Sequence, residues 1–342
     1  MNNIDGYDVA IVGVTGLVGE TLVTVLQEAD FPIRSLYPLA SARSIGKTVK
    51  FRGESIAVDD LAGFDFSKSQ IGFFSAGGAV SAEYAPVAAR AGCIVIDNTS
   101  QFRYEDDVPL IVPEVNAEAI AGYKRRNIIA NPNCSTIQLV VALKPIYDAV
   151  GIERINIATY QSVSGAGRSS IEQLAHETVE LMSGRPLEGA EREAQIAFNA
   201  RPQVDVFQDN GYTREEMKIV WETRKILGDD TIRINATAVR IPVFFGHSEA
   251  VHIETRDKIS ADEARAVLNA APGVSVRDEP RVADYPTAVT DAARGDMVFV
   301  GRIREDISHP RGLDLWVVAD NIRKGAALNS VQIAEILVES YL

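Results

Sequence analysis

The chain has 342 residues, of which 46% are hydrophobic and 24% are charged, a composition ordinary for a soluble globular protein of about two domains. Its formal charge of −13 argues against nucleic acid and anionic membranes as partners, so an anionic substrate would need a locally basic pocket. Two cysteines form no disulfide framework, and without a recognisable signal peptide or long apolar span the expected location is a reducing cytoplasm.

The first predicted elements are a strand, a glycine-rich turn and a helix. The strand covers residues 8–14, and the turn places Gly13, Gly16 and Gly19 at the spacing Gly-x-x-Gly-x-x-Gly before a helix that reaches Glu28. In dinucleotide sites the first glycine permits a tight turn, the second lets backbone approach a pyrophosphate, and the third lets the helix pack on the strand. Glycines also mark ordinary turns, but the strand–turn–helix context favours a nucleotide site.

The second strand is predicted at residues 34–40 and is followed by Ser41, Ala42, Arg43 and Ser44. An enzyme that uses NAD usually places Asp or Glu here to hold the ribose 2′-hydroxyl, and this chain has neither. A guanidinium flanked by hydroxyls suits a 2′-phosphate, so the sequence favours NADP over NAD. The alternative is a solvated loop arginine.

Further strands at residues 70–74 and 93–97, with a helix between them, predict a doubly wound parallel sheet. Ser75, Ala76 and Gly77 follow the first of these strands, at the end of the sheet where cofactors bind in open α/β folds. A plain strand-to-helix turn explains these small residues equally well. Cys93 lies in an apolar strand and is predicted to be a core residue.

Arg103 comes after the strand at 93–97 and a polar turn, where it can present a guanidinium to an anion; a surface arginine is the alternative. A strand at 127–130 then leads to Asn131-Pro-Asn-Cys-Ser-Thr136 and a segment of helical periodicity. A cysteine at a helix N-terminus faces unpaired N–H groups and the positive end of the helix dipole, which both favour the thiolate. The same amides can receive an oxyanion. The alternative for Cys134 is a small apolar residue packed at a helix start.

The second half of the chain is predicted to form a largely antiparallel sheet from strands at 155–161, 233–240, 249–254, 296–304 and 312–319. Helices are predicted at 171–182, 215–227 and 326–341, and the last is long enough to cover the first domain. Residues 184–211 are polar and irregular, as expected of a lid or a subunit contact.

His247 follows a glycine-containing turn, where a histidine exposed to a cleft can act as a general base; a structural turn histidine is the alternative. Glu215 and Lys218 share a helix face, either as a surface ion pair or as a pair that holds an ammonium and an anion. No cluster of His, Cys and carboxylates has metal-ligand spacing, so no metal site is expected.

Together these stretches resemble the aspartate-semialdehyde dehydrogenase family. The residues that carry the resemblance are Gly13 to Gly19, Leu39 to Ser44, Phe73 to Gly77, Asn98 to Arg103, Asn131 to Thr136, Tyr160 to Gly167, Glu215 to Lys218 and Arg240 to His247. The resemblance implies a fold like that of glyceraldehyde-3-phosphate dehydrogenase, with a Rossmann-like NADP domain and an α+β catalytic and dimerisation domain. The expected domains are residues 1–131, joined by a C-terminal helix at 322–342, and residues 132–321.

The resemblance also implies a reaction, in which L-aspartyl 4-phosphate and NADPH interconvert with L-aspartate 4-semialdehyde, phosphate and NADP⁺. In the family this reaction feeds lysine, threonine, methionine and often diaminopimelate biosynthesis. Cys134 would form a thioester, His247 would exchange a proton with the hemithioacetal oxygen, and Gln161 would orient the intermediate. The implied substrate residues are Arg240 for the α-carboxylate, Glu215 for the α-ammonium, and Arg103, Lys218 and Asn133 for the phosphate.

The cofactor-binding residues expected from the motifs and the resemblance are Gly13, Thr15, Gly16, Leu17, Val18, Ser41, Arg43, Ser44, Ser75, Ala76, Gly77, Ser164, Gly165 and Asn321. A homodimer or homotetramer is expected. One rival is an N-acetyl-glutamyl-phosphate reductase, but the cysteine motif of that family, similar to Pro-Gly-Cys-Tyr-Pro, is absent. Other rivals are a non-catalytic NADP-binding sensor, which should have lost Cys134 or His247, and a thiol hydrolase, which would not need the nucleotide fingerprint.

Overall fold

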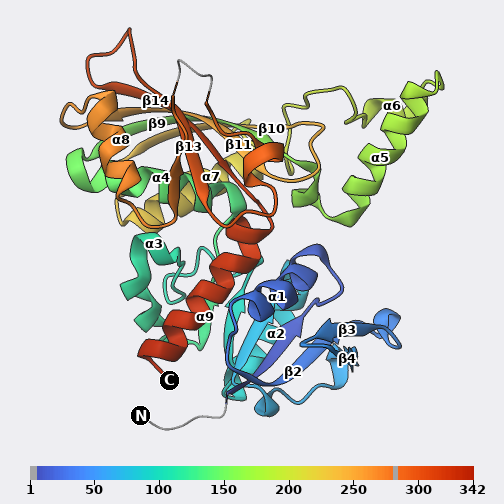
Figure 1. Cartoon of the computed structure of the whole chain (residues 1–342). Helices are drawn as coiled ribbons and strands as arrows, with labels where there is room; N and C mark the ends of the chain where they lie inside the picture. The colour runs from blue at the N-terminus through green and yellow to red at the C-terminus, as the bar shows by residue number, and fades with distance from the viewer. Residues whose placement is uncertain (1–5, 280–283) are drawn as a thin grey trace. The chain divides into compact units, whose positions relative to one another are not determined.

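The computed structural model describes residues 6–279 and 284–342, so residues 1–5 of the expected first domain lie outside the described residues. The chain divides into two compact units, one of Met1–Asn133 with Ala326–Leu342 and one of Cys134–Gly325. Figure 1 shows the helices and strands of both units. Within the described ranges no helix combines the length and the apolar character needed to cross a membrane.

The first unit contains a six-stranded sheet in which every pairing is parallel. The strand order is β5-β2-β1-β6-β7-β8, so the order reverses beside β1 as in a doubly wound sheet. The strands are β1 (Tyr7–Val12), β2 (Ile33–Ala40), β5 (Asp59–Asp60), β6 (Ile71–Phe74), β7 (Ile94–Asp97) and β8 (Ile128–Ala130). β3 (Thr48–Phe51) and β4 (Glu54–Ala57) form a separate antiparallel pair. The predicted parallel sheet is confirmed.

The helices of the first unit are α1 (Leu17–Glu28), α2 (Gly78–Arg90), α3 (Pro113–Asn116) and the C-terminal α9 (Leu328–Ser340). Leu22 of α1 and Val331 and Leu337 of α9 are fully buried or nearly so in one core cluster with Val9 and Ile11 of β1. Burying a side chain of this size contributes about 1.5–3 kcal/mol, and this explains why the last helix returns to the N-terminal sheet.

The second unit contains a six-stranded mixed sheet in the order β10-β9-β11-β14-β13-β12. Its strands are β9 (Ile152–Gln161), β10 (Arg233–Arg240), β11 (His247–Thr255), β12 (Val274–Val276), β13 (Val298–Glu305) and β14 (Gly312–Ala319). The central pairings are antiparallel, as predicted, but β10 runs parallel to β9 and β12 parallel to β13. A long helical crossover separates β9 from β10. Connections of this length join parallel strands, whereas a short hairpin turn joins antiparallel ones.

One face of this sheet is covered by α4 (Cys134–Val150), whose residues from Ser135 to Leu143 are all buried. The other helices are α5 (Arg168–Met182), α6 (Gly189–Glu193), α7 (Arg214–Leu227) and α8 (Ala261–Asn269). α7 begins at a capping box of Thr213 and Glu216, and the Glu216 carboxylate also accepts the Ala238 N–H of β10 at 2.9 Å. The first turn of α7 is therefore fixed against the end of the sheet.

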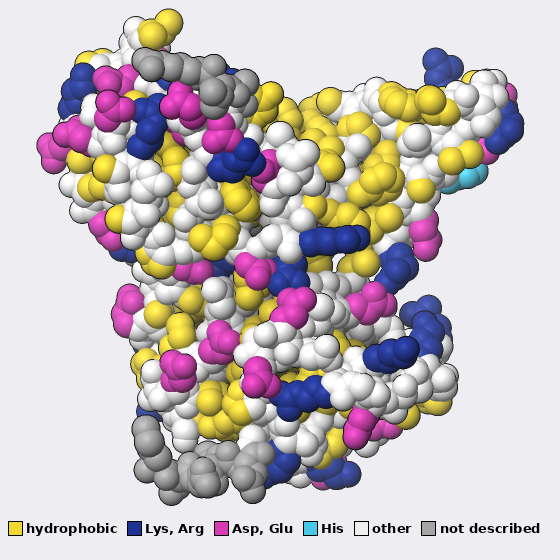
Figure 2. Space-filling view, in the orientation of Figure 1, with side chains coloured by type: hydrophobic (Ala, Val, Ile, Leu, Met, Phe, Trp, Pro, Cys, Tyr) yellow, Lys and Arg dark blue, Asp and Glu magenta, His cyan; other side chains and the backbone are white. Residues whose placement is uncertain are grey.

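The irregular segment at 184–211 is tied to α5 through Glu177. This buried carboxylate accepts the backbone N–H groups of Ile196 and Ala197 at 2.7 and 2.8 Å. Large apolar side chains are nevertheless exposed on α5, on this segment and on the loop before β11, and Figure 2 shows hydrophobic side chains gathered over this region. They include Val179, Met182, Phe198, Val206, Phe207, Phe244 and Phe245.

Candidate active site

A pocket of about 660 Å³ opens in the first unit after strands β1, β2 and β6. Seven residues expected at the cofactor line it: Gly13, Thr15, Gly16, Ser41, Arg43, Ser75 and Ala76. Leu17, Val18, Ser44 and Gly77 are not among its lining residues. The pocket is also lined by residues that were not predicted from the sequence, among them Asp60, Leu61, Glu83 and Tyr84 from β5, the turn after it and α2.

The glycine-rich turn leaves no room for side chains. Gly13 has φ +86°, and a Cβ there would lie 2.9 Å from the Ala76 backbone nitrogen. A Cβ on Gly19 would lie 2.3 Å from the Gly13 carbonyl oxygen, closer than real contacts allow. The tight turn and the close approach of helix to strand are the features that a dinucleotide pyrophosphate requires, so this turn fits a nicotinamide dinucleotide.

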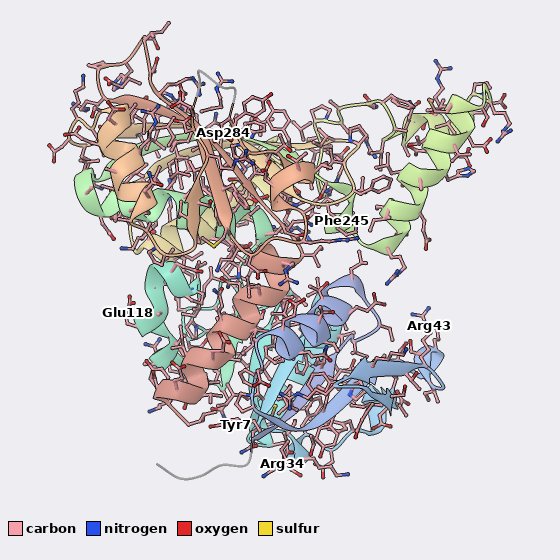
Figure 3. The ribbon with its side chains drawn as sticks, in the orientation of Figure 1. Tyr7, Arg34, Arg43, Glu118, Phe245 and Asp284 are labelled. Carbon is pink, nitrogen blue, oxygen red and sulfur yellow. The ribbon has the colours of Figure 1, made fainter. Side chains whose placement is uncertain are left out.

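Arg43 lies in a 3₁₀ turn (Ala42–Ser44) at the mouth of this pocket, and its side chain points away from the ribbon (Figure 3). It is exposed and forms no ion pair with any described residue. Asp60 lines the same pocket, but its carboxylate already caps the following turn by accepting the Ala62 N–H at 3.3 Å. Of these two side chains, Arg43 is therefore the one available to bind an anion in the pocket.

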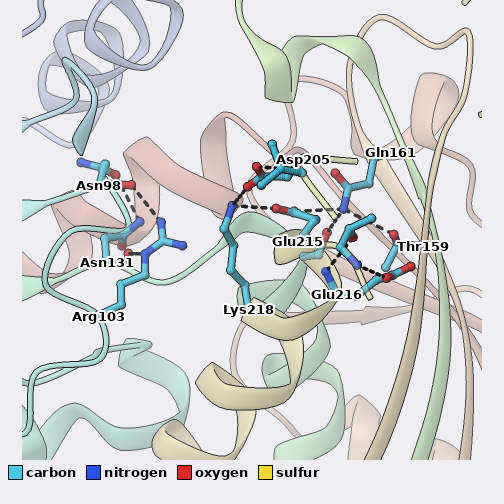
Figure 4. Close-up of polar contacts among 12 residues, drawn as sticks. Asn98, Arg103, Asn131, Thr159, Gln161, Asp205, Glu215, Glu216 and Lys218 are labelled. Atoms are coloured by element: carbon cyan, nitrogen blue, oxygen red, sulfur yellow. Dashed lines mark hydrogen bonds and ion pairs between the residues drawn. The ribbon is translucent and has the colours of Figure 1, made fainter. Parts of the chain in front are cut away.

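Arg103 in the first unit is 6% exposed, so the alternative of a surface arginine is wrong. Its Nε donates to the Asn131 carbonyl at 2.9 Å, and its Nη2 donates to the Asn98 carbonyl at the same distance (Figure 4). Asn98 and Asn131 are joined side chain to side chain at 3.1 Å. The guanidinium is thus fixed to the backbone of Asn131, two residues before Asn133, which ends the first segment of the unit and is 7% exposed.

Cys134 is the first residue of α4 and is half-buried. A Cβ on Gly325 would lie 2.8 Å from the Cys134 Cβ, so only glycine fits opposite the cysteine. The position at the N-terminus of a 17-residue helix is the one predicted, and it places the thiol at the positive end of the helix dipole.

His247 begins β11 and is fully buried, which contradicts the expectation of an exposed ring. Its Nδ1 accepts the Ser162 N–H at 3.1 Å, so the neutral ring carries its proton on Nε2. Nε2 has no hydrogen-bond partner among the described residues. Burial, and secondarily the Arg240 charge, lower the pKa of His247 to about 3. The imidazole is therefore a neutral hydrogen-bond donor at physiological pH.

Arg240 ends β10, and its Nη1 donates to the Ser162 carbonyl at 2.5 Å. A Cβ on Gly165 would lie 3.3 Å from His247 Nε2 and 3.5 Å from Arg240 Nη1, so this glycine keeps the space beside both groups open. Burial lowers the pKa of Arg240, while the charges of Glu215 and Cys134 act in the opposite direction. Cys134, Arg240, Glu215 and His247 thus share one electrostatic environment.

Gln161, at the end of β9, connects these groups to α7 (Figure 4). Its Nε2 lies 3.0 Å from Ser135 Oγ on α4 and 3.1 Å from Glu215 Oε1 on α7. The other carboxylate oxygen of Glu215 accepts from Lys218 Nζ at 3.0 Å. Glu215 is 5% exposed, so the pair with Lys218 is a buried site feature and not a surface ion pair.

Asn321 is also buried, and its Oδ1 accepts from Ser162 Oγ, Ser164 Oγ and the Gly246 N–H at 3.0 to 3.2 Å. These bonds hold together the two loops that carry His247 and Gly165. The second unit therefore brings together Gln161, Ser164, Gly165, Glu215, Lys218, Arg240, His247 and Asn321 of the predicted residues. Sequence reasoning missed Asp205, whose carboxylate bonds Lys218 at 2.8 Å.

Two domain families match the chain. Residues 8–123 match the semialdehyde dehydrogenase NAD-binding domain, and residues 143–324 match the semialdehyde dehydrogenase dimerisation domain. The first unit is therefore an NAD-binding domain of this type, and the second a dimerisation domain.

Whole-chain relatives agree with these matches. The chain is 64% identical to the aspartate-semialdehyde dehydrogenase of Legionella pneumophila over 98% of this chain and 96% of that one, and 46% identical to that of Bacillus subtilis over 97% of each. A crystal structure of aspartate semialdehyde dehydrogenase II from Vibrio cholerae complexed with ASA is 58% identical. It superposes with a TM-score of 0.96 over 99% of this chain and all of that one. The chain belongs to the aspartate-semialdehyde dehydrogenase family.

Proposed function

We propose that the chain catalyses the reversible reductive dephosphorylation of L-aspartyl 4-phosphate to L-aspartate 4-semialdehyde. The observation that carries this proposal is the set of buried polar groups in the second unit, where His247, Arg240 and Glu215 share one environment with Cys134. An enzyme that acts on an amino-acid acyl phosphate requires four groups: a nucleophile for the acyl carbon, a hydrogen-bond donor for its oxygen, a cation for the α-carboxylate and a carboxylate for the α-ammonium.

In this mechanism the Cys134 thiolate attacks the acyl carbon, a C–S bond forms, and phosphate leaves with the electrons of the C–O bond. The N–H groups at the start of α4 and the Nε2–H of His247 donate hydrogen bonds to the oxyanion on that carbon. Ser162 fixes the required His247 tautomer through its backbone N–H. When bound, the nicotinamide cofactor supplies the hydride that converts the acyl group into the aldehyde.

The remaining residues bind the substrate. Arg240 holds the α-carboxylate through its planar guanidinium, and Glu215 holds the α-ammonium. Lys218, Arg103 and Asn133 bind the phosphate. Gln161 orients the intermediate, since its amide is fixed between Ser135 of α4 and Glu215 of α7. Glu215 favours a substrate with a charged α-amine over the N-acetylated substrate of the rival reductase.

We further propose that the cofactor is NADP, with Arg43 bound to the 2′-phosphate and Ser41 beside it in the pocket lining. A solved aspartate semialdehyde dehydrogenase from Candida albicans, 26% identical with a TM-score of 0.75, is described with NADP. The test is the ratio of kcat/KM for NADP⁺ to that for NAD⁺, which Arg43→Glu should lower at least tenfold. A wild type that prefers NAD⁺ would contradict this assignment.

We propose that the chain forms a homodimer, or a homotetramer built from dimers, through the exposed apolar residues on α5 and the segment at 184–211. An apolar surface of this kind is typical of obligate interfaces. The protein mass measured by light scattering distinguishes the two assemblies, and a monomer would refute both.

We also propose a cytoplasmic location, because Cys93 is a fully buried thiol not joined to Cys134.

The proposed activity is tested by phosphate-dependent reduction of NADP⁺ with L-aspartate 4-semialdehyde, in parallel with N-acetyl-L-glutamate 5-semialdehyde. We expect turnover with the first aldehyde that requires phosphate or arsenate, and little with the second. Absence of turnover with either would favour a non-catalytic NADP-binding protein, and preference for the acetylated aldehyde would favour the rival reductase.

A further inference from the structure

Lys218 is bound by two carboxylates and not by one (Figure 4). Its Nζ lies 2.8 Å from Asp205 Oδ2 and 3.0 Å from Glu215 Oε2. The side chain of Lys218 is 13% exposed, so these contacts are shielded from water far more than a surface pair. Glu215 has a role in the proposed function, whereas no role has been assigned to Asp205.

Asp205 is placed opposite Lys218 by a short hairpin. The Arg214 N–H donates to the Val206 carbonyl at 2.8 Å, and this bond closes the hairpin directly before α7 begins. Asp205 itself has φ +68°, and its Oδ1 accepts the Val206 N–H at 2.8 Å. Both partners of the ion pair are therefore fixed to the start of α7, one through the hairpin and the other through the helix.

Carboxylates outnumber the ammonium in the direct contacts of Lys218. The ammonium and its two carboxylates sum to a charge of −1, with Arg214 near Asp205 and Arg240 near Glu215, and two of the three N–H donors of Lys218 are used by described residues. The pKa of Lys218 is raised by both carboxylates against the effect of burial, and the pKa of Asp205 is lowered by Lys218. A phosphate that approaches Lys218 must compete with the Asp205 carboxylate, whose side chain is 26% exposed.

We propose that Asp205 is a positioning residue that sets the affinity and selectivity of the phosphate site by competing with the incoming anion for Lys218. This inference rests on the proposed function of Lys218. A phosphate dianion outcompetes one carboxylate for the ammonium, whereas a monoanion such as chloride or acetate does not. Asp205 therefore keeps weakly bound anions away from the acyl carbon in a protein whose substrate must be an anion.

The test compares Asp205→Asn with the wild type in the phosphate-dependent oxidation of L-aspartate 4-semialdehyde. We expect the KM for phosphate to fall about threefold to tenfold, the range that one partly buried ion pair controls. The kcat and the KM values for aldehyde and NADP⁺ should stay within about twofold. Inhibition by acetate and chloride should become stronger in the variant.

Two variants serve as controls. Asp205→Glu retains the carboxylate and should restore the wild-type KM for phosphate. Asp209→Asn removes an exposed carboxylate from the same segment and should change nothing. A KM for phosphate in Asp205→Asn that is equal to or above the wild-type value would overturn the inference. Parallel changes in the KM values for phosphate, aldehyde and NADP⁺ would also overturn it, because a purely structural role would produce them.

A second readout separates this inference from the proposed function. Inorganic phosphate that binds the folded protein raises its melting temperature, and the half-maximal concentration should be lower for Asp205→Asn than for the wild type. An inactive wild type would refute the proposed function, while this comparison would still decide whether Asp205 competes with phosphate. Equal half-maximal concentrations would overturn the competition.

Discussion

His247 acts in this account as a neutral donor and not as an imidazolium. The Ser162 N–H occupies Nδ1, and burial beside Arg240 lowers the pKa of the ring to about 3. Because the folded pKa lies below the usual 6.5, the ring stays neutral as the pH falls from 8 to 5. The proton on Nε2 is then available to the oxyanion throughout this range.

We therefore predict that His247→Ala lowers kcat by about 10²–10⁴-fold, whereas His247→Gln, which retains an N–H donor, loses less. Between pH 5 and 8, kcat/KM of the wild type should show the same dependence on pH as kcat/KM of His247→Gln, because the ring does not titrate in this range. A wild-type limb with a pKa near 6.5 that disappears in this variant would show that the ring titrates as an ordinary histidine, contrary to the account.

Glu249 is a second buried titratable residue on β11, and no role in the reaction has been assigned to it. Its side chain is fully buried, and burial raises the pKa of the carboxyl well above 4.5, while the Gln138 side chain offsets this only in part. The folded chain keeps this carboxyl neutral, whereas the unfolded chain ionises it. The stability that it contributes is present below the unfolded pKa and is lost as the pH rises through the folded pKa.

Glu249→Gln keeps the shape of the side chain and removes the ionisation. We predict that the melting temperature of the variant relative to the wild type increases as the pH is raised from 5 to 8. The gain at pH 8 should correspond to on the order of 1–3 kcal/mol in the free energy of unfolding. A difference that does not change with pH would mean that Glu249 is not kept neutral by the fold.

The elements that position the site are the glycine turn before α1 and the start of α4. Gly19 is the residue on which the first depends, because a Cβ there would meet the Gly13 carbonyl oxygen and the Val14 Cα at 2.3 and 2.6 Å. Both are backbone atoms, so no flexible side chain can move aside. The turn and the helix would have to separate.

Gly19→Ala is accordingly predicted to raise the KM for NADP⁺ at least tenfold and to lower the melting temperature by several degrees. Gly122→Ala is a matched control in the same unit, since its added Cβ would only make ordinary contacts of 3.6 Å or more with Pro109. If both variants bound the cofactor like the wild type, close packing of α1 on β1 would not be a requirement of the site.

The sequence predicts the elements well where the pattern is local. The second strand was expected at residues 34–40 and is observed at Ile33–Ala40, and the helix after Cys134 begins where the Asn-Pro-Asn turn ends. The parallel pairing of β10 with β9 was not predicted, because it depends on a crossover and not on the alternation within either strand. Asp205 and Asp60 were not predicted, because each lies outside any periodic segment and only the tertiary structure brings it to its site.

On the scale of the whole molecule, the proposed nucleophile Cys134 is the first residue of the second unit. The first unit ends at Asn133 and resumes at Ala326, and the second unit places Gly325 directly against Cys134. The residues at which the chain enters and leaves the second unit, Cys134 and Gly325, therefore lie against each other. Although the protein carries a net charge of −13, each unit holds shielded cations: Arg103 is buried in the first, and Lys218 and Arg240 are partly buried in the second.

Cys93 provides an internal comparison for Cys134, the proposed nucleophile. It is fully buried beside Ser69, and burial raises its pKa to about 11, so it remains a thiol at neutral pH. Only Cys134 stands at a helix N-terminus. The two cysteines of the chain should therefore differ sharply in their reaction with substrate.

The measurement that tests the central claim most directly is the intact mass of the protein after brief incubation with L-aspartate 4-semialdehyde and NADP⁺ in the absence of phosphate, followed by acid quenching. Without phosphate the thioester cannot be released as the acyl phosphate, so it should accumulate. The account predicts a mass increase of one aspartyl group that maps to the peptide containing Cys134, is retained in Cys93→Ala and is absent from Cys134→Ala. An unchanged mass in a sample that turns over once phosphate is added, or an adduct on Cys93, would contradict it.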